Sequence, residues 1–166
     1  MAMKDALIAE LKQESANTRK MLERTHPDKF SWKPHEKSMT LGRLAAHIAE
    51  IPVWANRTID AQEYDFASNP VKSNVYANTE ELLQVFEKTL AAAIDALQGV
   101  TDEQLNLPYQ LKRGGVVIYE LPRKVLIRNF VFSHLVHHRG QLSVYLRMLD
   151  IPVPGMYGPS ADEMGF

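Results

Sequence analysis

Hydrophobic residues recur every three to four positions along four stretches of the chain, which is the spacing of one face of an α-helix. Pro52 lies inside the second stretch and should kink that helix or begin its second half, because proline removes an intrahelical hydrogen bond. The helices predicted in this way cover residues 3–24, 38 or 40 to 61, 78–98 and 122–149. Four amphipathic helices with almost no strand predict an all-α four-helix bundle, with antiparallel or crossover connections.

Two segments depart from the helical pattern. Residues 109–119 contain two short runs of strand-forming residues on either side of Gly114-Gly115, which predicts a small hairpin or an extended excursion. Residues 151–166 contain three prolines and three glycines, and we expect this C-terminal tail to lie irregularly over the bundle. Because no internal repeat and no linker-like stretch divides the sequence, we expect a single domain over residues 1–166.

Composition and charge exclude several classes of function. The chain has 166 residues, of which 45% are hydrophobic and 23% are charged, as in an ordinary globular protein. A net charge of −1 gives no electrostatic reason to expect nucleic acid or an anionic membrane as a partner. No hydrophobic run approaches the roughly 20 residues of a membrane helix, and the N-terminus is unlike a signal peptide, so we expect a cytoplasmic location. The absence of cysteine excludes disulfides, thiol nucleophiles and thiolate metal sites.

The six histidines are the remaining candidates for chemistry, and two of them lie one helical turn apart. His134 and His138 are four residues apart in the last predicted helix, so their side chains project from the same face. At about 100° per residue this face coincides with the hydrophobic stripe, which indicates that both rings point into the bundle. His137 lies at the edge of the stripe and is a weaker candidate. The pair alone is equally consistent with two hydrogen-bonded core histidines.

A third histidine changes that balance. His47 lies on the hydrophobic side of the second predicted helix, and three neutral imidazoles from two facing helices can bind a divalent ion with open positions for water or substrate. Ligation removes the desolvation cost of burying the rings, provided that each spare ring nitrogen meets an acceptor. Glu50 and Gln141 each lie three residues from a histidine and are candidates for that role, as is Tyr145. The general base is not identified by the sequence: Glu50, Tyr145 and Tyr157 are candidates, although a structural role is favoured for each.

The sequence resembles a known family at these positions. Phe132–Leu142, which reads FSHLVHHRGQL, and Ile151–Glu163, which reads IPVPGMYGPSADE, look like the last helix and tail of the DinB/YfiT-like metalloenzymes. The Leu44–His47 segment with Glu50 is similar to the first-ligand helix of that family. The resemblance implies an up-down-down-up bundle, frequently a homodimer, and a divalent ion, most often nickel or zinc. Its ligands would be His47, His134 and His138. Relatives include thiol-dependent S-transferases and a thiol-dependent isomerase.

Two functions fit these observations. In the first, the chain is a metal-dependent enzyme acting on a small-molecule substrate, because an ion with only neutral ligands lowers the pKa of bound water or thiol. This predicts a hydrolase or a thiol S-transferase, and the thiol would be a low-molecular-weight cofactor because the chain has no cysteine. In the alternative, the chain is a non-catalytic stress or binding protein whose ion closes the core. A cleft that reaches the histidines would favour the enzyme.

Overall fold

The structure is a computed structural model that describes residues 2–71 and 74–164. Its helices are α1 (Met3–Leu22), α2 (Leu41–Glu50), α3 (Val53–Asp60), α4 (Thr79–Gly99), α5 (Asp102–Asn106), α6 (Arg123–Ile127), α7 (His134–Met148) and α8 (Ala161–Met164). A short 3-10 turn, η1 (Pro27–Lys29), follows α1, and a π-helical segment, η2 (Arg128–Ser133), joins α6 to α7. Three strands, β1 (Glu63–Asp65), β2 (Pro108–Arg113) and β3 (Val116–Pro122), complete the fold.

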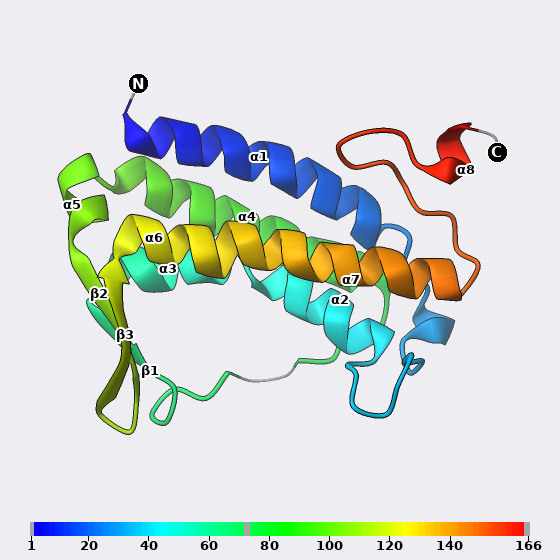
Figure 1. Cartoon of the computed structure of the whole chain (residues 1–166), viewed down its shortest axis with the longest axis horizontal. Helices are drawn as coiled ribbons and strands as arrows, with labels where there is room; N and C mark the ends of the chain where they lie inside the picture. Colours follow the sequence, from blue (N-terminus) through cyan, green and yellow to red (C-terminus); the bar gives the residue numbers. More distant parts are fainter. Residues whose placement is uncertain (1, 72–73, 165–166) are drawn as a thin grey trace.

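The long helices form a bundle of four (Figure 1). Helices α1 and α6–α7 run in one direction, and α2–α3 and α4 run in the other, which is the up-down-down-up order that the resemblance implied. Helix α4 packs against α1, α2 and α3, while α7 packs against α1 and α2. The helix pair α2 and α7, which carries the three histidines of interest, is therefore in direct contact across the bundle. The predicted all-helical bundle is confirmed, with a small sheet added at one end.

The second predicted helix is interrupted where the sequence indicated. Thr40 caps the start of helix α2, since its hydroxyl accepts a hydrogen bond from the backbone N–H of Arg43 at 3.2 Å. It ends at Glu50, and α3 begins at Val53, so the interruption falls on Ile51 and Pro52. The missing N–H of proline explains the break. Because α3 continues in roughly the direction of α2 (Figure 1), the two helices together span one side of the bundle.

The small sheet has the order β1-β2-β3 and lies at the end of the bundle where α3 finishes. Strands β2 and β3 form the predicted hairpin, and Gly114 and Gly115 turn it with φ angles of 62° and 78°, which favour glycine. Strand β1, which pairs parallel with β2, was not predicted, because the segment that contains it is polar and irregular in sequence. Asp65 accepts hydrogen bonds from the backbone N–H groups of Gly114 and Gly115 at 2.9 and 2.7 Å, which attaches β1 to the hairpin turn.

A crossover segment (residues 61–78, described except for 72–73) leads from the sheet back along the bundle to the start of α4 (Figure 1). It passes beside α2 and α3, and this position makes it one wall of the cavity described below. Asn78 ends the segment by capping α4, since its side-chain oxygen accepts from the backbone N–H of Glu81 at 2.9 Å.

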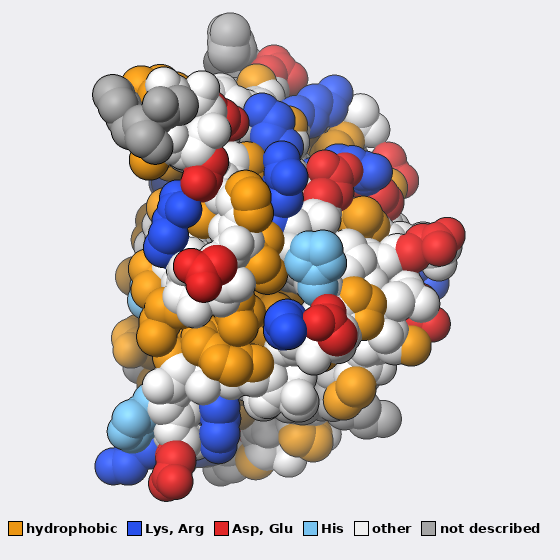
Figure 2. All heavy atoms as spheres, turned by 90° about the vertical axis from the view of Figure 1, so that its right-hand side faces the viewer, with side chains coloured by type: hydrophobic (Ala, Val, Ile, Leu, Met, Phe, Trp, Pro, Cys, Tyr) orange, Lys and Arg blue, Asp and Glu red, His pale blue; other side chains and the backbone are white. Residues whose placement is uncertain are grey.

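The hydrophobic core lies between the four long helices. Large fully buried side chains come from α1, α2 and α4, and α7 adds buried leucines; they include Leu11, Leu22, Leu44, Ile48, Phe86, Leu97, Leu135, Leu142 and Leu146. None of the described helices combines the length and apolar character that a membrane crossing needs. At the end of the bundle that bears the C-terminal tail, acidic and basic side chains alternate around a hydrophobic patch (Figure 2). Among the described side chains of that face, no continuous basic surface is present.

Candidate metal centre

Three histidines from α2 and α7 meet in the interior of the bundle. One ring nitrogen from each of His47, His134 and His138 can be chosen so that all three lie within 4.8 Å of one another. The ring centroids form a nearly equilateral triangle, with separations of 4.9, 4.6 and 4.7 Å. His47 Nε2 and His134 Nε2 are 3.1 Å apart. The structure therefore brings together the three histidines that the sequence singled out.

The spacing of the His47 and His134 nitrogens fits ligation of a shared divalent ion. Two imidazole nitrogens, each 2.0–2.1 Å from a shared ion, lie about 2.8–3.0 Å apart at neighbouring octahedral positions and about 3.3–3.4 Å apart in a tetrahedron. The 3.1 Å separation between His47 and His134 lies between these two distances. An all-nitrogen set of donors suits zinc, nickel, copper or iron rather than calcium or magnesium, which prefer oxygen ligands.

The protonation state of the three rings also fits a metal site. Burial lowers the pKa of His47 from 6.5 to about 3, and the neighbouring His138, His134 and Arg43 add to the effect. Burial is also the main cause that lowers the pKa values of His134 and His138. All three rings are consequently neutral at pH 7, and the neutral imidazole is the form that binds a metal.

A π-helical segment, η2, directly precedes His134. The backbone N–H of His134 bonds to the carbonyl of Val131, three residues back, rather than to that of Phe130 as in a regular α-helix. Nε2 of His134 faces His47, and the Phe130 backbone raises the pKa of the His134 ring against the larger lowering effect of burial. The single α-helix predicted over residues 122–149 did not include this interruption; π-helical turns occur frequently at functional sites.

A side-chain acceptor orients His138. Its Nδ1 lies 2.7 Å from Oε1 of Gln141, one turn further along α7, so Nε2 is left to face the other two histidines. Gln141 thus occupies the position expected of it. His137 is exposed and lies outside the group of three, although its ring packs edge-on against that of His138 with centroids 4.7 Å apart.

Glu50 was predicted to accept a hydrogen bond from a ligand histidine, but its partners in the structure are other residues. Its Oε1 accepts hydrogen bonds from the Tyr76 hydroxyl at 2.9 Å and from Asn74 Nδ2 at 2.6 Å, and its Oε2 lies 3.7 Å from Arg43 Nη1. Among the described residues no hydrogen bond joins Glu50 to His47. Burial, with Glu50 as the next cause, raises the pKa of Tyr76 to about 12, so this phenol remains a donor. Asn74 and Tyr76 come from the crossover segment, whose sequence carries no periodic signal for them.

The two tyrosines named as general-base candidates have other partners. The Tyr145 hydroxyl donates to the backbone carbonyl of Met39 at 3.2 Å, and its ring packs edge-on against Trp32. The Tyr157 hydroxyl donates to Glu14 at 2.8 Å. In the described part of the chain neither hydroxyl forms a hydrogen bond with a histidine, so the structure does not bring either of them to the site.

Arg139 organises the surroundings of Tyr157. Its guanidinium is 98% buried and bonds to Glu14, to the hydroxyl of Thr18 and to the hydroxyl of Tyr157. These contacts join α1, α7 and the C-terminal tail. Since Arg139 directly follows His138, the network fixes the turn of α7 that carries two of the three histidines.

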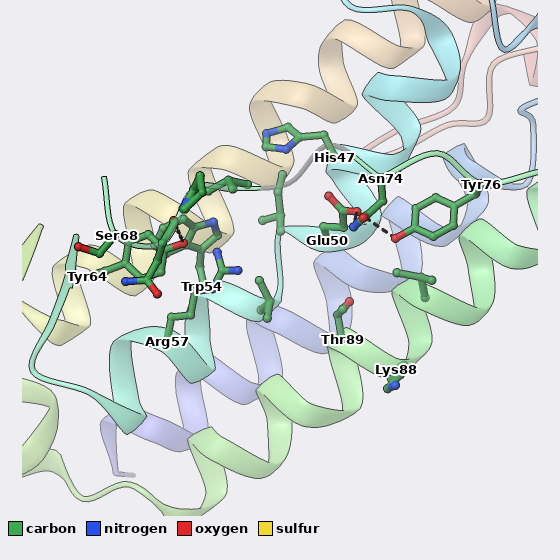
Figure 3. A pocket seen from close by; sticks show the side chains of 16 residues that line it. His47, Glu50, Trp54, Arg57, Tyr64, Ser68, Asn74, Tyr76, Lys88 and Thr89 are labelled. Atoms are coloured by element: carbon green, nitrogen blue, oxygen red, sulfur yellow. Dashed lines mark hydrogen bonds between the residues drawn. The ribbon is translucent and has the colours of Figure 1, made fainter. Parts of the chain in front are cut away.

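A cavity of about 780 Å³ extends along α2 and α3 under the crossover segment (Figure 3). Trp54, Arg57 and Tyr64 lie at one end, and His47 and Glu50 lie between them and Tyr76. Its volume is within the range of small-molecule sites. Of the three histidines, His47 lines this open cleft, which is the arrangement expected of an enzyme rather than of a closed structural site.

Comparisons with known proteins agree with this architecture. The uncharacterized protein YrdA of Bacillus subtilis is 26% identical over 152 residues, which are 90% of this chain and 85% of YrdA. The crystal structure of the DinB-like protein YjoA of B. subtilis superposes with a TM-score of 0.71 at 20% identity, covering 93% of this chain and 99% of YjoA. The mycothiol-dependent maleylpyruvate isomerase shares the fold more distantly, with a TM-score of 0.54 at 10% identity over 91% of this chain and 62% of the isomerase. The DinB family model matches residues 1–165, and the chain therefore belongs to the DinB family.

Proposed function

We propose that this protein is a divalent-metal-dependent enzyme in which His47, His134 and His138 hold the ion and the adjoining cavity binds a small-molecule substrate. The observation that carries the proposal is a cluster of three neutral imidazoles, one of which, His47, lines a cavity of about 780 Å³. When bound, the ion would act as a Lewis acid and lower the pKa of a water or thiol ligand towards neutrality. Nickel and zinc are the metals that we expect.

The protein's own residues have distinct roles in this proposal. His47 stands at the boundary between the cluster and the cavity, so an incoming water or thiol approaches on its side. Gln141 orients the ring of His138. Glu50 is the one carboxylate among the described residues that line the cavity. Its Oε1 is engaged by Tyr76 and Asn74, whereas its Oε2 has the longer 3.7 Å contact with Arg43 and is the oxygen to which we assign acceptance of the proton that the water or thiol loses.

The reaction class follows from which nucleophile is activated. A water nucleophile gives a hydrolase, and a thiol nucleophile gives an S-transferase or a thiol-dependent isomerase. The chain supplies no thiol of its own, so the second case needs a low-molecular-weight thiol as a cofactor. The shared fold with a mycothiol-dependent isomerase supports the thiol reading.

Metal analysis of the purified protein tests the first step. We expect close to one nickel or zinc ion per chain, and we expect His138→Ala to lose it. His137→Ala is the matched control, because it removes an exposed neighbouring histidine that lies outside the group of three. Stoichiometric metal retained by His138→Ala, or lost equally by His137→Ala, would contradict the assignment.

Replacement of the ion by cobalt(II) tests the second step. Added glutathione or cysteine should change the visible absorption of the cobalt protein if a thiol reaches the ion, and electrophile screening with and without thiol then defines the reaction. A cobalt spectrum that neither thiols nor azide alters would show a closed site. That result would overturn the proposed enzyme and support the alternative, a non-catalytic bundle that its ion stabilises.

A further inference from the structure

The end of the cavity far from the histidines carries an arginine without an anionic partner. The Arg57 guanidinium carbon lies 4.8 Å from the ring centroid of Trp54 and 5.1 Å from that of Tyr64. Such cation–π contacts attract the charge of the guanidinium but do not take the place of hydrogen-bond acceptors for its N–H groups. Among the described residues, none accepts a hydrogen bond from the Arg57 side chain and no carboxylate forms an ion pair with it. A partly buried cation is thus held in a fixed position with its donors free.

The charges of the remaining cavity wall favour an anion. Lys88 is a second cation in the lining, and no ion pair to it is formed within the described residues. Glu50 is the one acidic residue among the described residues that line the cavity, and Tyr76, Asn74 and Arg43 already engage it. Lys88 lies beside Thr89, on the side of the cavity away from Trp54 and Tyr64 (Figure 3), so Arg57 supplies the positive charge at the Trp54–Tyr64 end, which a negatively charged ligand would compensate.

From this geometry we infer that Arg57, which packs against both rings of the Trp54–Tyr64 pair, is a binding residue for the carboxylate of a small-molecule ligand whose other end reaches His47. A guanidinium edge matches a carboxylate because two parallel N–H groups can donate to its two oxygens. Arg57 lies ten residues after His47 along α2 and α3, which corresponds to about 15 Å of helix. The ligand is thus an elongated anion, and the placement of its reacting end at His47 rests on the proposed function.

Tyr64 connects the Trp54–Tyr64 ring pair to the rest of the fold. Its ring packs against Trp54 with centroids 5.0 Å apart, and its hydroxyl donates to the backbone carbonyl of Asn69 at 2.6 Å. Asn69 is in turn part of the cavity lining. The aromatic pair therefore fixes Arg57 and the nearby crossover segment together, so the anion subsite is built before a ligand arrives.

Calorimetric titration of the full-length protein tests the subsite with 4-phenylbutyrate and its neutral analogue 4-phenylbutyramide. We expect the carboxylate to bind about tenfold to hundredfold more tightly than the amide, as charge-assisted hydrogen bonds would give. Arg57→Gln should remove this preference, and Arg57→Lys should retain part of it because the charge remains. Arg113→Gln is the matched control, since it removes one positive charge from the exposed hairpin turn and should leave the preference unchanged. Circular dichroism of each variant checks that it is folded.

Three results would overturn the inference: equal affinity for the two probes, no binding of either at millimolar concentration, or the same preference in Arg57→Gln as in the parent protein. The last result would assign Arg57 a purely structural role, in which it packs against Tyr64 of the crossover segment. The same titration in His138→Ala separates this inference from the proposed function. Carboxylate binding that persists in that variant shows that the subsite exists without the ion.

A second measurement tests the link between the subsite and the histidines. In the cobalt-substituted protein, 8-mercaptooctanoate should alter the visible spectrum at a concentration about tenfold lower than 8-mercaptooctanol. Half-saturation at the same concentration for both thiols would contradict a ligand that spans both ends of the cavity. If neither thiol alters the spectrum while 4-phenylbutyrate still binds in an Arg57-dependent way, the proposed function fails and the anion subsite stands.

Discussion

Replacement of Gln141 by leucine should weaken metal binding without disturbing the fold. Gln141 is exposed, and its Oε1 lies 2.7 Å from Nδ1 of the candidate ligand His138. Loss of an outer hydrogen bond to a ligating histidine typically reduces metal affinity by 10–100-fold, which is about 1.4–2.8 kcal/mol. We expect a 10–100-fold loss of metal affinity in Gln141→Leu, because the leucine leaves the His138 Nδ1–H without its side-chain acceptor.

The measurement is a competition titration of zinc between the protein and a chromophoric chelator. Gln84→Leu is the matched control, because it makes the same substitution on the exposed face of α4. Gln141→Glu should bind zinc at least as tightly as the parent protein, since a carboxylate is a stronger acceptor for the ring N–H. A zinc affinity of Gln141→Leu within about threefold of the control would refute the argument, as would an equal loss of affinity in Gln84→Leu.

Three further predictions concern stability. Chelation should lower the melting temperature of the metal-loaded protein by roughly 5–11 °C. An ion at 100 times its Kd contributes about 2.7 kcal/mol to the free energy of unfolding, and each kcal/mol shifts the transition by about 2–4 °C. An unchanged transition after verified metal removal would contradict this prediction. In the metal-free protein, His47 has a pKa of about 3 when folded and 6.5 when unfolded. Between these two pH values the unfolded chain binds more protons than the folded one. The free energy of unfolding should therefore fall as the pH drops from 6.5 towards 3. Urea titrations at pH 7 and pH 5 check this, and His47→Gln should show a smaller pH dependence than the parent. Arg139→Met should lower the free energy of unfolding by about 3–5 kcal/mol, because it leaves Glu14, itself 9% exposed, without its buried cation. Adding Glu14→Gln should recover part of this loss. Strictly additive effects of the two substitutions would argue against an energetic coupling between Arg139 and Glu14.

The homodimer implied by the family resemblance also stays a prediction. Four consecutive hydrophobic residues of the outer strand β3, Val116 to Tyr119, are 43–69% exposed, so the surface of the hairpin is available for contact. Light scattering of the purified protein decides between monomer and dimer.

Local patterns were sufficient for the predictions that succeeded. Helix periodicity located the four long helices, the proline at 52 located the break between α2 and α3, and paired glycines located the hairpin turn. The four-residue spacing of His134 and His138 placed both rings on one face, because the geometry of an α-helix follows from the backbone alone. The hydrophobic neighbours of His47 then indicated that it faces the same interior.

Other features follow from contacts between segments that are distant in sequence. Strand β1 forms because the hairpin offers it a parallel partner and hydrogen bonds to Asp65, and no hydrophobic pattern in the crossover segment announces it. Glu50 accepts hydrogen bonds from Tyr76 and Asn74 rather than from a histidine. Residue spacing on a single helix gives no information about such partners.

The sequence by itself determined the four helices and identified the three histidines, because both depend on the repeat of one regular backbone conformation. Only the tertiary structure decided that these rings meet at one point, that a π-helical segment precedes His134, and that a cavity leads from His47 to an arginine packed against a pair of aromatic rings. The physical reason is that a helix fixes the direction of its side chains relative to its own axis, whereas their distances to other elements depend on how the whole chain packs.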